Sequence, residues 1–498
     1  MIKAFLSRVG LIKNESPRPH EAAGRGRRFA SVHAPGSGPN AILSGDLPEL
    51  IRRSRAAYRN NGWIKQGLQR HVSNTVGAHI TPLFKFEDEG IRNALRQQWP
   101  LFVDRADADG ALNFYGQLAL ADLTRRLAGE CFVRIRPRRN DGALPVPLQV
   151  QLLEPEMVPL EKTEVAPNGN QIIHGIEFNR RGQRVAYHVY TEHPLDWTGI
   201  SRTYLRTVRI PARFMLHHYK PERPGQIRGK PETVQSLVAA FDYAEYSQSE
   251  LVRKKAKAAH TAVVERDEYP EEEDFLYDPM TGSAIGTPDD GMTTIEPGAY
   301  NVLLPGEKVR FADGDNTGSG YSDFQRWQLL SMSAGMTQPY PIFTGDMTGI
   351  NDRLWRAITN EYYRALDMDR DHLVIHQICE PVKNWFVDTC WLTNLVDMPD
   401  YTTRRNEYQA VSWQPHGRKY LHPVQDVQTR VMEINNGLQS RSASVADLGR
   451  NAEDIDKQQE ADDARRMYPA DSGAVNTNPD NEGRSEERRV GKECRSRW

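Results

Sequence analysis

The stretch PGQIRGKPETVQSLVAAFDYAEYSQSELVRKKAKAAH, residues 224–260, decides the fold, because it predicts one long helix with two unlike halves. Pro231 suits the first helical position and Glu232 suits the first turn, where the helix dipole favours an acid. The first half carries apolar residues at helical spacing, namely Val234, Leu237, Val238, Phe241 and Ala244. We therefore expect this half to pack against a core.

The second half of the stretch has no proper apolar face. Gln248 and three lysines interrupt the stripe, and small alanines replace large apolar groups. Thirty helical residues span roughly 45 Å, and a lone helix of this kind is only marginally stable. Two readings stay open: a surface helix with a solvated charged face, or identical helices that pack side by side in an assembly.

The composition of the chain limits the classes of protein to which it can belong. The 498 residues suffice for two to four domains or for one subunit of several parts, and 38% of them are hydrophobic. No run approaches the roughly 18 apolar residues of a membrane helix, and the start MIKAFLSRVGLIKN does not resemble a signal peptide. Four cysteines without CxxC spacing suggest cytosolic thiols. The net charge of −2 argues against a tight grip on nucleic acid.

The charge is spread unevenly along the chain. Residues 1–44 read as a flexible basic arm, and the block ERDEYPEEED (265–274) is strongly acidic. The polar stretch 468–483 reads as a disordered tail. The last fifteen residues, RSEERRVGKECRSRW (484–498), resemble a translated sequencing adapter that was read through into the open reading frame. We treat them as an artefact and exclude them from functional reasoning.

The periodicity of apolar residues predicts an α+β protein. Helical patterns cover 47–75, with a break at Asn60-Asn61-Gly62, and then 91–105 and 112–127. Alternating strand patterns follow between 131 and 219. After the long helix, helical patterns return at residues 321–336, 352–388, 424–437 and 444–467.

The motifs that carry chemistry elsewhere are incomplete in this chain. GQIRGKP (225–231) has too few residues between its glycines for a phosphate-binding loop, and DGDNTGSGYSDF (313–324) lacks the final glutamate of a calcium loop. His217 and His218 are adjacent on a strand pattern, so their side chains point to opposite faces and cannot share a metal. The sequence therefore predicts no catalytic, cofactor or metal site.

Four motifs in order resemble the portal proteins of tailed bacteriophages, specifically the lambda-like portal family. They are RPGQIRGKP with its long helix, RNNGWIKQGLQRHVSNTVGAHITP (59–82), EPGAYNVLLPGEKVRF (296–311) and YSDFQRWQLLSMSAGMTQPYPIFTGDMTGIN (321–351). The resemblance covers roughly residues 25–465. One departure follows Asn351, where Asp352-Arg353-Leu354-Trp355 replace the small hydroxyl residues usual in the family.

The resemblance implies a portal fold, in which the parts follow one another in a fixed order. A wing of helices and a mixed sheet takes residues 45–230, stem helix 1 takes 231–260, and a small α/β clip takes 261–320. Stem helix 2 takes 321–336, a tunnel loop 337–351, a wing helix 352–400 and a helical crown 401–467. Leu237 and Phe241 would then pack within the subunit.

The resemblance also implies a function. Portals are rings, typically of twelve subunits, at one capsid vertex, through which double-stranded DNA passes without sequence-specific contacts. Expected partners are the terminase large subunit, head-completion proteins, and the major capsid and scaffold proteins, with no membrane. The location would be the virion, and the host cytoplasm during assembly. The alternatives are a helical scaffold or head-assembly protein without a channel and, less favoured, a packaging-associated enzyme.

Candidate residues follow from the same resemblance. The ring-interface candidates on the stem are Leu251, Val252, Ala256 and Ala259. The candidates that would face DNA are Lys254, Lys255, Lys257, Arg353 and Arg356. The clip candidates for docking terminase are Glu271, Glu272, Glu273 and Asp274.

Overall fold

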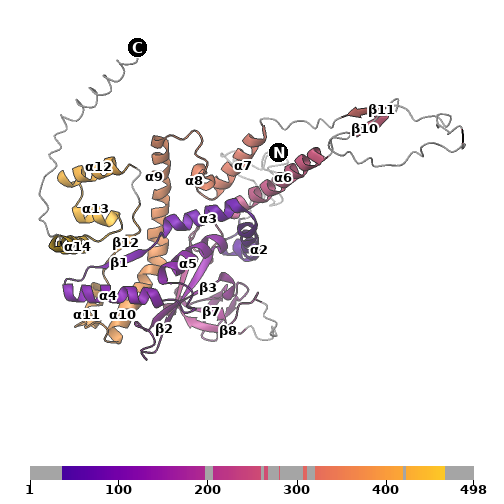
Figure 1. Ribbon diagram of the computed structural model, residues 1–498. Helices are drawn as coiled ribbons and strands as arrows, with labels where there is room; N and C mark the ends of the chain where they lie inside the picture. Colours follow the sequence, from indigo (N-terminus) through magenta and orange to yellow (C-terminus); the bar gives the residue numbers. More distant parts are fainter. Residues whose placement is uncertain are drawn as a thin grey trace, which may run out of the picture. The chain divides into compact units, whose positions relative to one another are not determined.

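The computed structural model describes residues 36–196, 206–259, 263–266, 280, 307–310, 320–418 and 422–465, and Figure 1 shows their helices and strands. The chain forms two compact units. The first combines Met1–Arg70, Leu120–Ile135 and Gln151–Met347, and the second combines His71–Ala119, Arg136–Val150 and Thr348–Trp498. Each unit thus unites segments that lie far apart in the sequence.

A five-stranded sheet lies in the first unit. It runs in the order β4 (Glu164–Val165), β5 (Gln171–Ile173), β6 (Ile176–Phe178), β7 (Arg184–Tyr190) and β8 (Thr207–Pro211). Its pairings are all antiparallel, where the sequence analysis expected a mixed sheet in the wing. His174 and Gly175 join β5 to β6, and both have positive φ, as the tight hairpins of twisted sheets require.

Three further strands form a sheet in the order β3 (Leu148–Leu153), β2 (Glu130–Pro137) and β9 (Met215–Tyr219). Phe132 of β2 and Met215 of β9 are buried in one hydrophobic cluster with Ile176, Tyr187 and Ile210 of the five-stranded sheet. Two 3-10 turns border the strands, Pro155–Met157 (η3) and Ala212–Phe214 (η5). The expected α+β class and the alternating strand patterns are confirmed.

Helix α2 of the first unit begins earlier than the sequence suggested. α2 spans Pro39–Asn60, so residues 39–44 are helical and are not part of a flexible arm. α3 (Gly62–Thr75) follows the predicted break directly. Asn61 makes this break, since its side-chain oxygen accepts hydrogen bonds from the backbone of Trp63 (3.0 Å) and Ile64 (3.2 Å) as a helix cap. α5 spans Phe114–Ala128.

The long helix α6 spans Val234–Ala259 and therefore starts three residues after Pro231. The N–H of Val234 reaches the Pro231 carbonyl in a turn that precedes the helix. α7 (Gly320–Gly335) packs against α6, and α8 (Tyr340–Thr344) follows it. In Figure 1, α6 and α7 project side by side from the helices α2 and α3.

The second unit contains a two-stranded ladder that joins distant segments. β1 (Ile80–Phe84) pairs antiparallel with β12 (Val411–Pro415). Residues 411–415 are therefore a strand, although the sequence analysis placed them in a helical crown. α4 (Glu89–Arg105) contributes Trp99 and Phe102, which contact Phe386.

One continuous helical rod runs through the second unit. α9 (Asp352–Asp369) passes into a π-helical segment (Arg370–Cys379, η7) and then into α10 (Glu380–Leu392). Four shorter helices follow, which are α11 (Tyr401–Tyr408), α12 (Pro423–Asn435), α13 (Arg441–Asp447) and α14 (Ala452–Arg465). The last three confirm the helical patterns at 424–437 and 444–467.

Only short pieces of the 261–320 segment are described. β10 (Val263–Arg266) pairs antiparallel with β11 (Glu307–Arg310). Within the described parts of the chain, no helix combines the length and the hydropathy of a membrane span.

Candidate functional site

The helix pair α6–α7 is the first candidate site. On its inner side, Leu237 and Ala240 of α6 pack with Leu329 and Met332 of α7 in one buried cluster. The Ser236 hydroxyl donates to the Met332 carbonyl at 2.8 Å. A Cβ added to Gly335 would lie 2.4 Å from that hydroxyl oxygen, so the two helices approach closely at this point.

The exposed side of α6 carries three large apolar residues. Val238 is 70% exposed, Phe241 46% and Val252 58%. At about 100° per residue, these three positions share one side of the helix, which adjoins the face of Leu237 and Ala240 and is turned about a quarter of a circle away from it. α6 thus leaves three apolar side chains exposed on one side, where the exposed Glu245 and Gln248 lie between Phe241 and Val252. We call Val238, Phe241 and Val252 the outer face of α6.

α7 repeats this arrangement. Trp327 is 69% exposed and Leu330 is also exposed, whereas Leu329 and Met332 are buried. Trp327 and Leu330 lie on the side of α7 that faces away from the core. We call these two residues the outer face of α7.

The sequence analysis was wrong about part of the stripe on α6. Leu237 is buried as expected, but Val238, Phe241 and Ala244 are exposed. The buried side of α6 is centred on Ser236, Leu237 and Ala240, so only the Leu237 edge of the expected stripe meets the core.

The remaining ring-interface candidates lie on the same helix. Leu251 and Val252 are exposed, which leaves them free to meet another chain. Ala256 and Ala259 belong to α6, but their side chains lie outside the described set, as does that of Lys257. Glu271, Glu272, Glu273 and Asp274 also lie outside the described residues.

The basic candidates have different surroundings. Lys254 lies 4.7 Å from the ring centre of Tyr321 and 3.9 Å from the carboxylate of Glu250, so its charge is partly used within the helix pair. Lys255 and Arg353 are exposed.

Arg356 has a carboxylate close by. It is half-buried, and its guanidinium lies 3.8 Å from the Asp426 carboxylate of α12. This carboxylate compensates part of its positive charge, and the expectation that Arg356 faces DNA stays a prediction.

The segment expected as a tunnel loop, 337–351, is partly helical. α8 buries Phe343, and Gly345 ends the helix with a left-handed backbone (φ 83°). Arg70 of α3 donates to the Ile342 carbonyl, and Gln338 donates to the Gly67 carbonyl at 2.8 Å. Residues 338–345 are thus fastened to α3.

The motif RPGQIRGKP builds a buried ionic centre. The Arg228 side chain is buried and donates to Glu130 at 2.6 Å and to the carbonyls of Pro155 (3.1 Å) and His174 (2.9 Å). The Gly229 N–H donates to the other oxygen of Glu130 at 2.9 Å. Burial alone would raise the pKa of Glu130, but Arg228 outweighs it and lowers that pKa to about 2.

Two glycines let this motif approach strand β2. A Cβ on Gly229 would lie 2.0 Å from the carbonyl oxygen of Gly129, and Gly129 itself has φ +92°. Neither position admits a side chain without moving the backbone. The glycines that suggested a phosphate loop therefore serve backbone packing.

His217 lies in the same centre as a neutral ring. Its Nε2–H donates to Glu130 at 2.8 Å, and its Nδ1 accepts from Arg184 at 3.0 Å. Burial lowers the pKa of His217 to about 4 despite Glu130. Its neighbour His218 faces Asp122 at 3.7 Å instead. The two histidines thus meet different carboxylates, as their alternation on a strand predicts.

This histidine makes stability depend on pH. Between pH 6.5 and 4 the unfolded chain binds a proton at His217 that the folded chain excludes, so stability falls as the pH falls through this window. We expect a loss of about 2 kcal/mol between pH 7 and 5 from this group. His217→Gln keeps a donor for Glu130 and does not titrate. Urea unfolding at both pH values should show a smaller loss for the variant, and equal losses would contradict this role.

A second ionic centre corrects the role of Glu232. Its two oxygens accept from Arg125 and Arg126 of α5, each at 2.7 Å, and both arginines also bind the buried Asp122. Burial alone would raise the pKa of Asp122, but Arg126 and Arg125 hold it well below its usual range. Glu232 therefore anchors the turn before α6 to α5, and it does not act through the dipole of α6.

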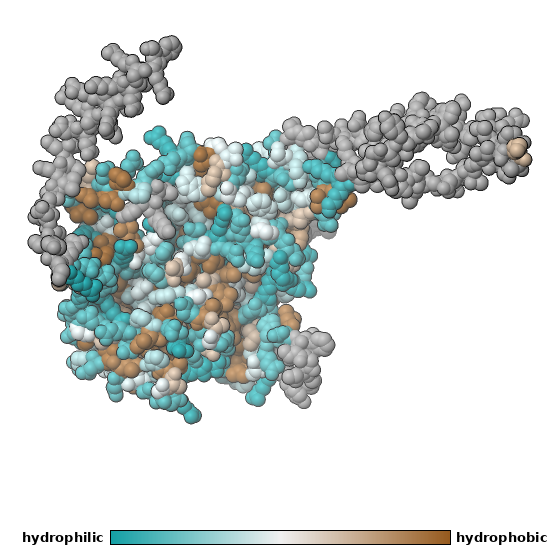
Figure 2. All heavy atoms as spheres, in the orientation of Figure 1, coloured by the Kyte–Doolittle hydropathy of each residue, from teal (hydrophilic) through white to brown (hydrophobic). Residues whose placement is uncertain are grey.

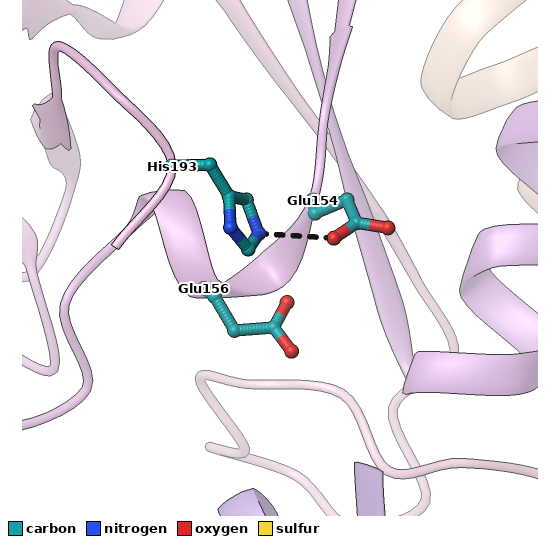
Figure 3. A group of neighbouring side chains, drawn as sticks. All are labelled: Glu154, Glu156 and His193. Carbon is teal, nitrogen blue, oxygen red and sulfur yellow. Dashed lines mark hydrogen bonds and ion pairs between the residues drawn. The ribbon is translucent and has the colours of Figure 1, made fainter. Parts of the chain in front are cut away.

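Glu154, Glu156 and His193 form the one cluster with metal-ligand geometry among the described residues (Figure 3). Arg55 already bridges the two carboxylates, at 3.2 Å from Glu154 and 2.6 Å from Glu156. His193 Nε2 donates to Glu154 at 3.0 Å, and its Nδ1 accepts from the Leu195 N–H. Both ring nitrogens are in use and the arginine supplies the cation, so the residues do not fit a metal.

Comparison with known proteins defines the class of this chain. The family model described as phage portal protein, lambda family, matches residues 25–370. The chain is 22% identical over 448 residues to a probable portal protein of Halomonas phage phiHAP-1, covering 86% of this chain and 82% of the relative. It is 21% identical to portal protein B of Escherichia phage lambda over 483 residues, covering 88% and 87% of the two chains.

A solved structure, the neck of a native GTA particle computed with C12 symmetry, is also similar. It has a TM-score of 0.45 and 12% identity and covers 83% of this chain and 95% of that one. The family model spans most of the chain, so the chain belongs to the lambda family of phage portal proteins. This confirms the resemblance drawn from the four motifs.

Proposed function

We propose that the chain is one subunit of a closed ring at the capsid vertex, around a channel that double-stranded DNA crosses during packaging and ejection. The observation that carries the proposal is the pair of outer faces on α6 and α7. Val238, Phe241 and Val252 on one helix and Trp327 and Leu330 on the other are apolar and exposed. Large apolar side chains gathered on an exposed surface and bordered by polar residues are typical of protein interfaces.

The outer faces of α6 and α7 carry different residues, which suits a cyclic ring. In a cyclic ring each subunit uses two different surfaces, one toward each neighbour. We infer that the outer face of α6 in one subunit packs on the outer face of α7 in the next. The first half of α6 would then serve two contacts, one with its own core and one with the neighbouring subunit.

A second apolar strip supports repetition of the subunit. α12 buries none of its residues, yet Val424, Val427 and Val431 recur at helical spacing and are exposed. Figure 2 shows hydrophobic, brown side chains on the visible surface over α12. We assign this strip to a further contact between neighbouring subunits.

The mass of the full chain in solution tests the proposal. Native mass spectrometry should give a species of about a dozen copies of the 56.7 kDa chain. A monomer or dimer at micromolar concentration would contradict the ring and favour the helical scaffold without a channel. The described acidic and histidine clusters are already paired with arginines, so they give no support to a packaging-associated enzyme.

The expected partners remain those of a portal. The clip at 261–320 would dock the terminase large subunit and later the head-completion proteins, and the wing would contact the major capsid and scaffold proteins. The subunit would assemble in the host cytoplasm and remain in the virion. Lys255 and Arg353, which are exposed, stay our DNA-facing candidates together with Lys254 and Lys257.

Charge reversal tests the docking role of the clip. The substitutions Glu271→Lys, Glu272→Lys, Glu273→Lys and Asp274→Lys, made together, should weaken terminase binding and reduce its dependence on salt, because a repeated acidic field steers a basic partner. The ring mass should stay unchanged. Binding measured at about 50 and 200 mM salt checks this. Wild-type affinity in the variant would show that this acidic block is only a solvated loop.

A further inference from the structure

An open cavity of about 740 Å³ lies within the second unit, between the β1–β12 ladder, α4 and the start of α14. Its walls include Arg96 of α4, Gln414 of β12, and Arg450 and Asn451 from the turn before α14. A volume of this size is typical of sites that hold a small molecule of nucleotide size. No residue of the outer faces of α6 and α7 lines this cavity.

The cavity wall holds three buried nitrogens that lack a hydrogen-bond partner. They are Arg96 Nε, Gln414 Nε2 and Asn451 Nδ2. Gln414 is only 5% exposed. The orientation of the Asn451 amide is fixed, because its oxygen accepts from the Glu453 N–H at 3.3 Å. A guanidinium nitrogen is always a donor. All three unpartnered atoms of this wall are therefore hydrogen-bond donors. A ligand with acceptor oxygens would satisfy them.

The charges around the cavity favour an anion. Arg96, Arg450 and Lys457 line it, and Asp454 is the one acid among the lining residues. Arg96 is shared with Glu453 (3.0 Å) and Asp454 (3.7 Å), and Lys457 with Glu89 (3.4 Å). Among the described residues, no carboxylate lies within ion-pair distance of Arg450, which leaves its charge for a ligand.

Helix α14, which forms one wall of the cavity, is weakly held. α14 buries none of its residues, and its contacts to α4 include the ion pairs of Arg96 and Lys457. Exposed ion pairs of this kind contribute little to stability. The three donor atoms are buried, so a ligand would have to displace part of this wall to reach them, and the contacts of α14 oppose such a displacement only weakly.

We propose that this cavity binds a phosphate group, carried either by a free nucleotide or by a DNA strand. A carboxylate has two oxygens, whereas a phosphate offers three or more acceptors, which suits three donors from three elements together with the charge of Arg450. The site lies on a single subunit and does not depend on ring formation.

Calorimetric titration of the full chain tests the proposal. The probes are inorganic phosphate, deoxyadenosine monophosphate and a short single-stranded oligonucleotide, with sodium acetate at matched ionic strength as the control. We expect one phosphate site per chain and no binding of acetate. Tighter binding of the mononucleotide identifies a free nucleotide as the ligand, and tighter binding of the oligonucleotide identifies a strand. Equal heats for acetate, or no binding of any phosphate probe, would overturn the proposal.

Three variants locate the site. Arg96→Lys keeps a charge for Glu453 but loses the Nε–H, and Gln414→Met loses its donor at similar size. Each should weaken phosphate binding about tenfold, the worth of one lost hydrogen bond to an anion. Arg105→Lys, at the exposed end of α4, is the matched control and should bind as the wild type does.

The direction in which Gln414→Met changes the melting temperature is a further test. Removing a buried donor without a partner should raise the melting temperature of the ligand-free chain while it weakens phosphate binding. A structural glutamine with a partner would lower the melting temperature instead. A lower melting temperature, or unchanged phosphate binding in both cavity variants, would contradict the assignment.

Discussion

Replacing Val238 and Phe241 together by aspartate is expected to convert the ring into folded monomers. Both side chains lie on the outer face of α6, so the isolated subunit already exposes them and should keep its stability. In the ring, each loses the burial of an apolar side chain, worth about 1.5–3 kcal/mol. Each also places a carboxylate in an apolar contact without a partner, which costs more still. The loss recurs at every interface of the ring.

Native mass spectrometry of the variant gives the assembly state, and thermal unfolding gives the stability of the subunit. Gln235→Asp is the matched control, because Gln235 is exposed on the same helix but lies off the outer face. The control should form rings. A ring population equal to wild type in the double variant would show that the outer face of α6 contacts no neighbour.

Replacing Arg228 by methionine is expected to produce the largest loss of subunit stability. The substitution leaves the buried Glu130 carboxylate without its arginine, leaves the His174 carbonyl without a donor, and leaves the Pro155 carbonyl with only the Val158 N–H. Removing one partner of a buried ion pair typically costs about 3–5 kcal/mol. For a unit of this size we expect the melting temperature to fall by roughly 10 °C.

The double variant Arg228→Met with Glu130→Gln isolates the cause. The glutamine removes the uncompensated charge, so the pair should be more stable than Arg228→Met alone, and unfolding of all four proteins gives the coupling. Arg223→Met changes an exposed arginine of the same motif and should cost less than about 0.5 kcal/mol. Equal losses for Arg228→Met and Arg223→Met would contradict the buried ionic centre.

Local patterns predicted most elements of this fold. The break at Asn61, the strands between 131 and 219, and the helices after residue 320 all follow from the periodicity and capping of neighbouring residues. These local patterns could not predict contacts between segments that are far apart in the sequence. Nothing near Glu232 announces that it binds two arginines of α5, and nothing near Val411 shows that it pairs with Phe84. Such pairings depend on segments more than a hundred residues away.

The candidate site was only partly predictable for a related reason. An apolar residue on a helix signals contact but does not say with which chain. Val238 and Phe241 were therefore assigned to the core of their own subunit, although they are exposed. Trp327, the most exposed residue of the outer face of α7, was missed because it lies in a helix that reads as apolar on several sides. Only a structure separates the face that packs internally from the face left free.

Cross-linking between the two outer faces tests the ring most directly. Val238→Cys and Trp327→Cys are combined in one chain with Cys494→Ser, since the cysteines at 131, 379 and 390 are buried. With a bis-maleimide, the double variant should give a ladder of covalent oligomers that ends in a complete ring. Either single variant should stay monomeric on a denaturing gel, because two different faces meet. A ladder in a single variant, or none in the double variant, would contradict the contact between α6 of one subunit and α7 of the next.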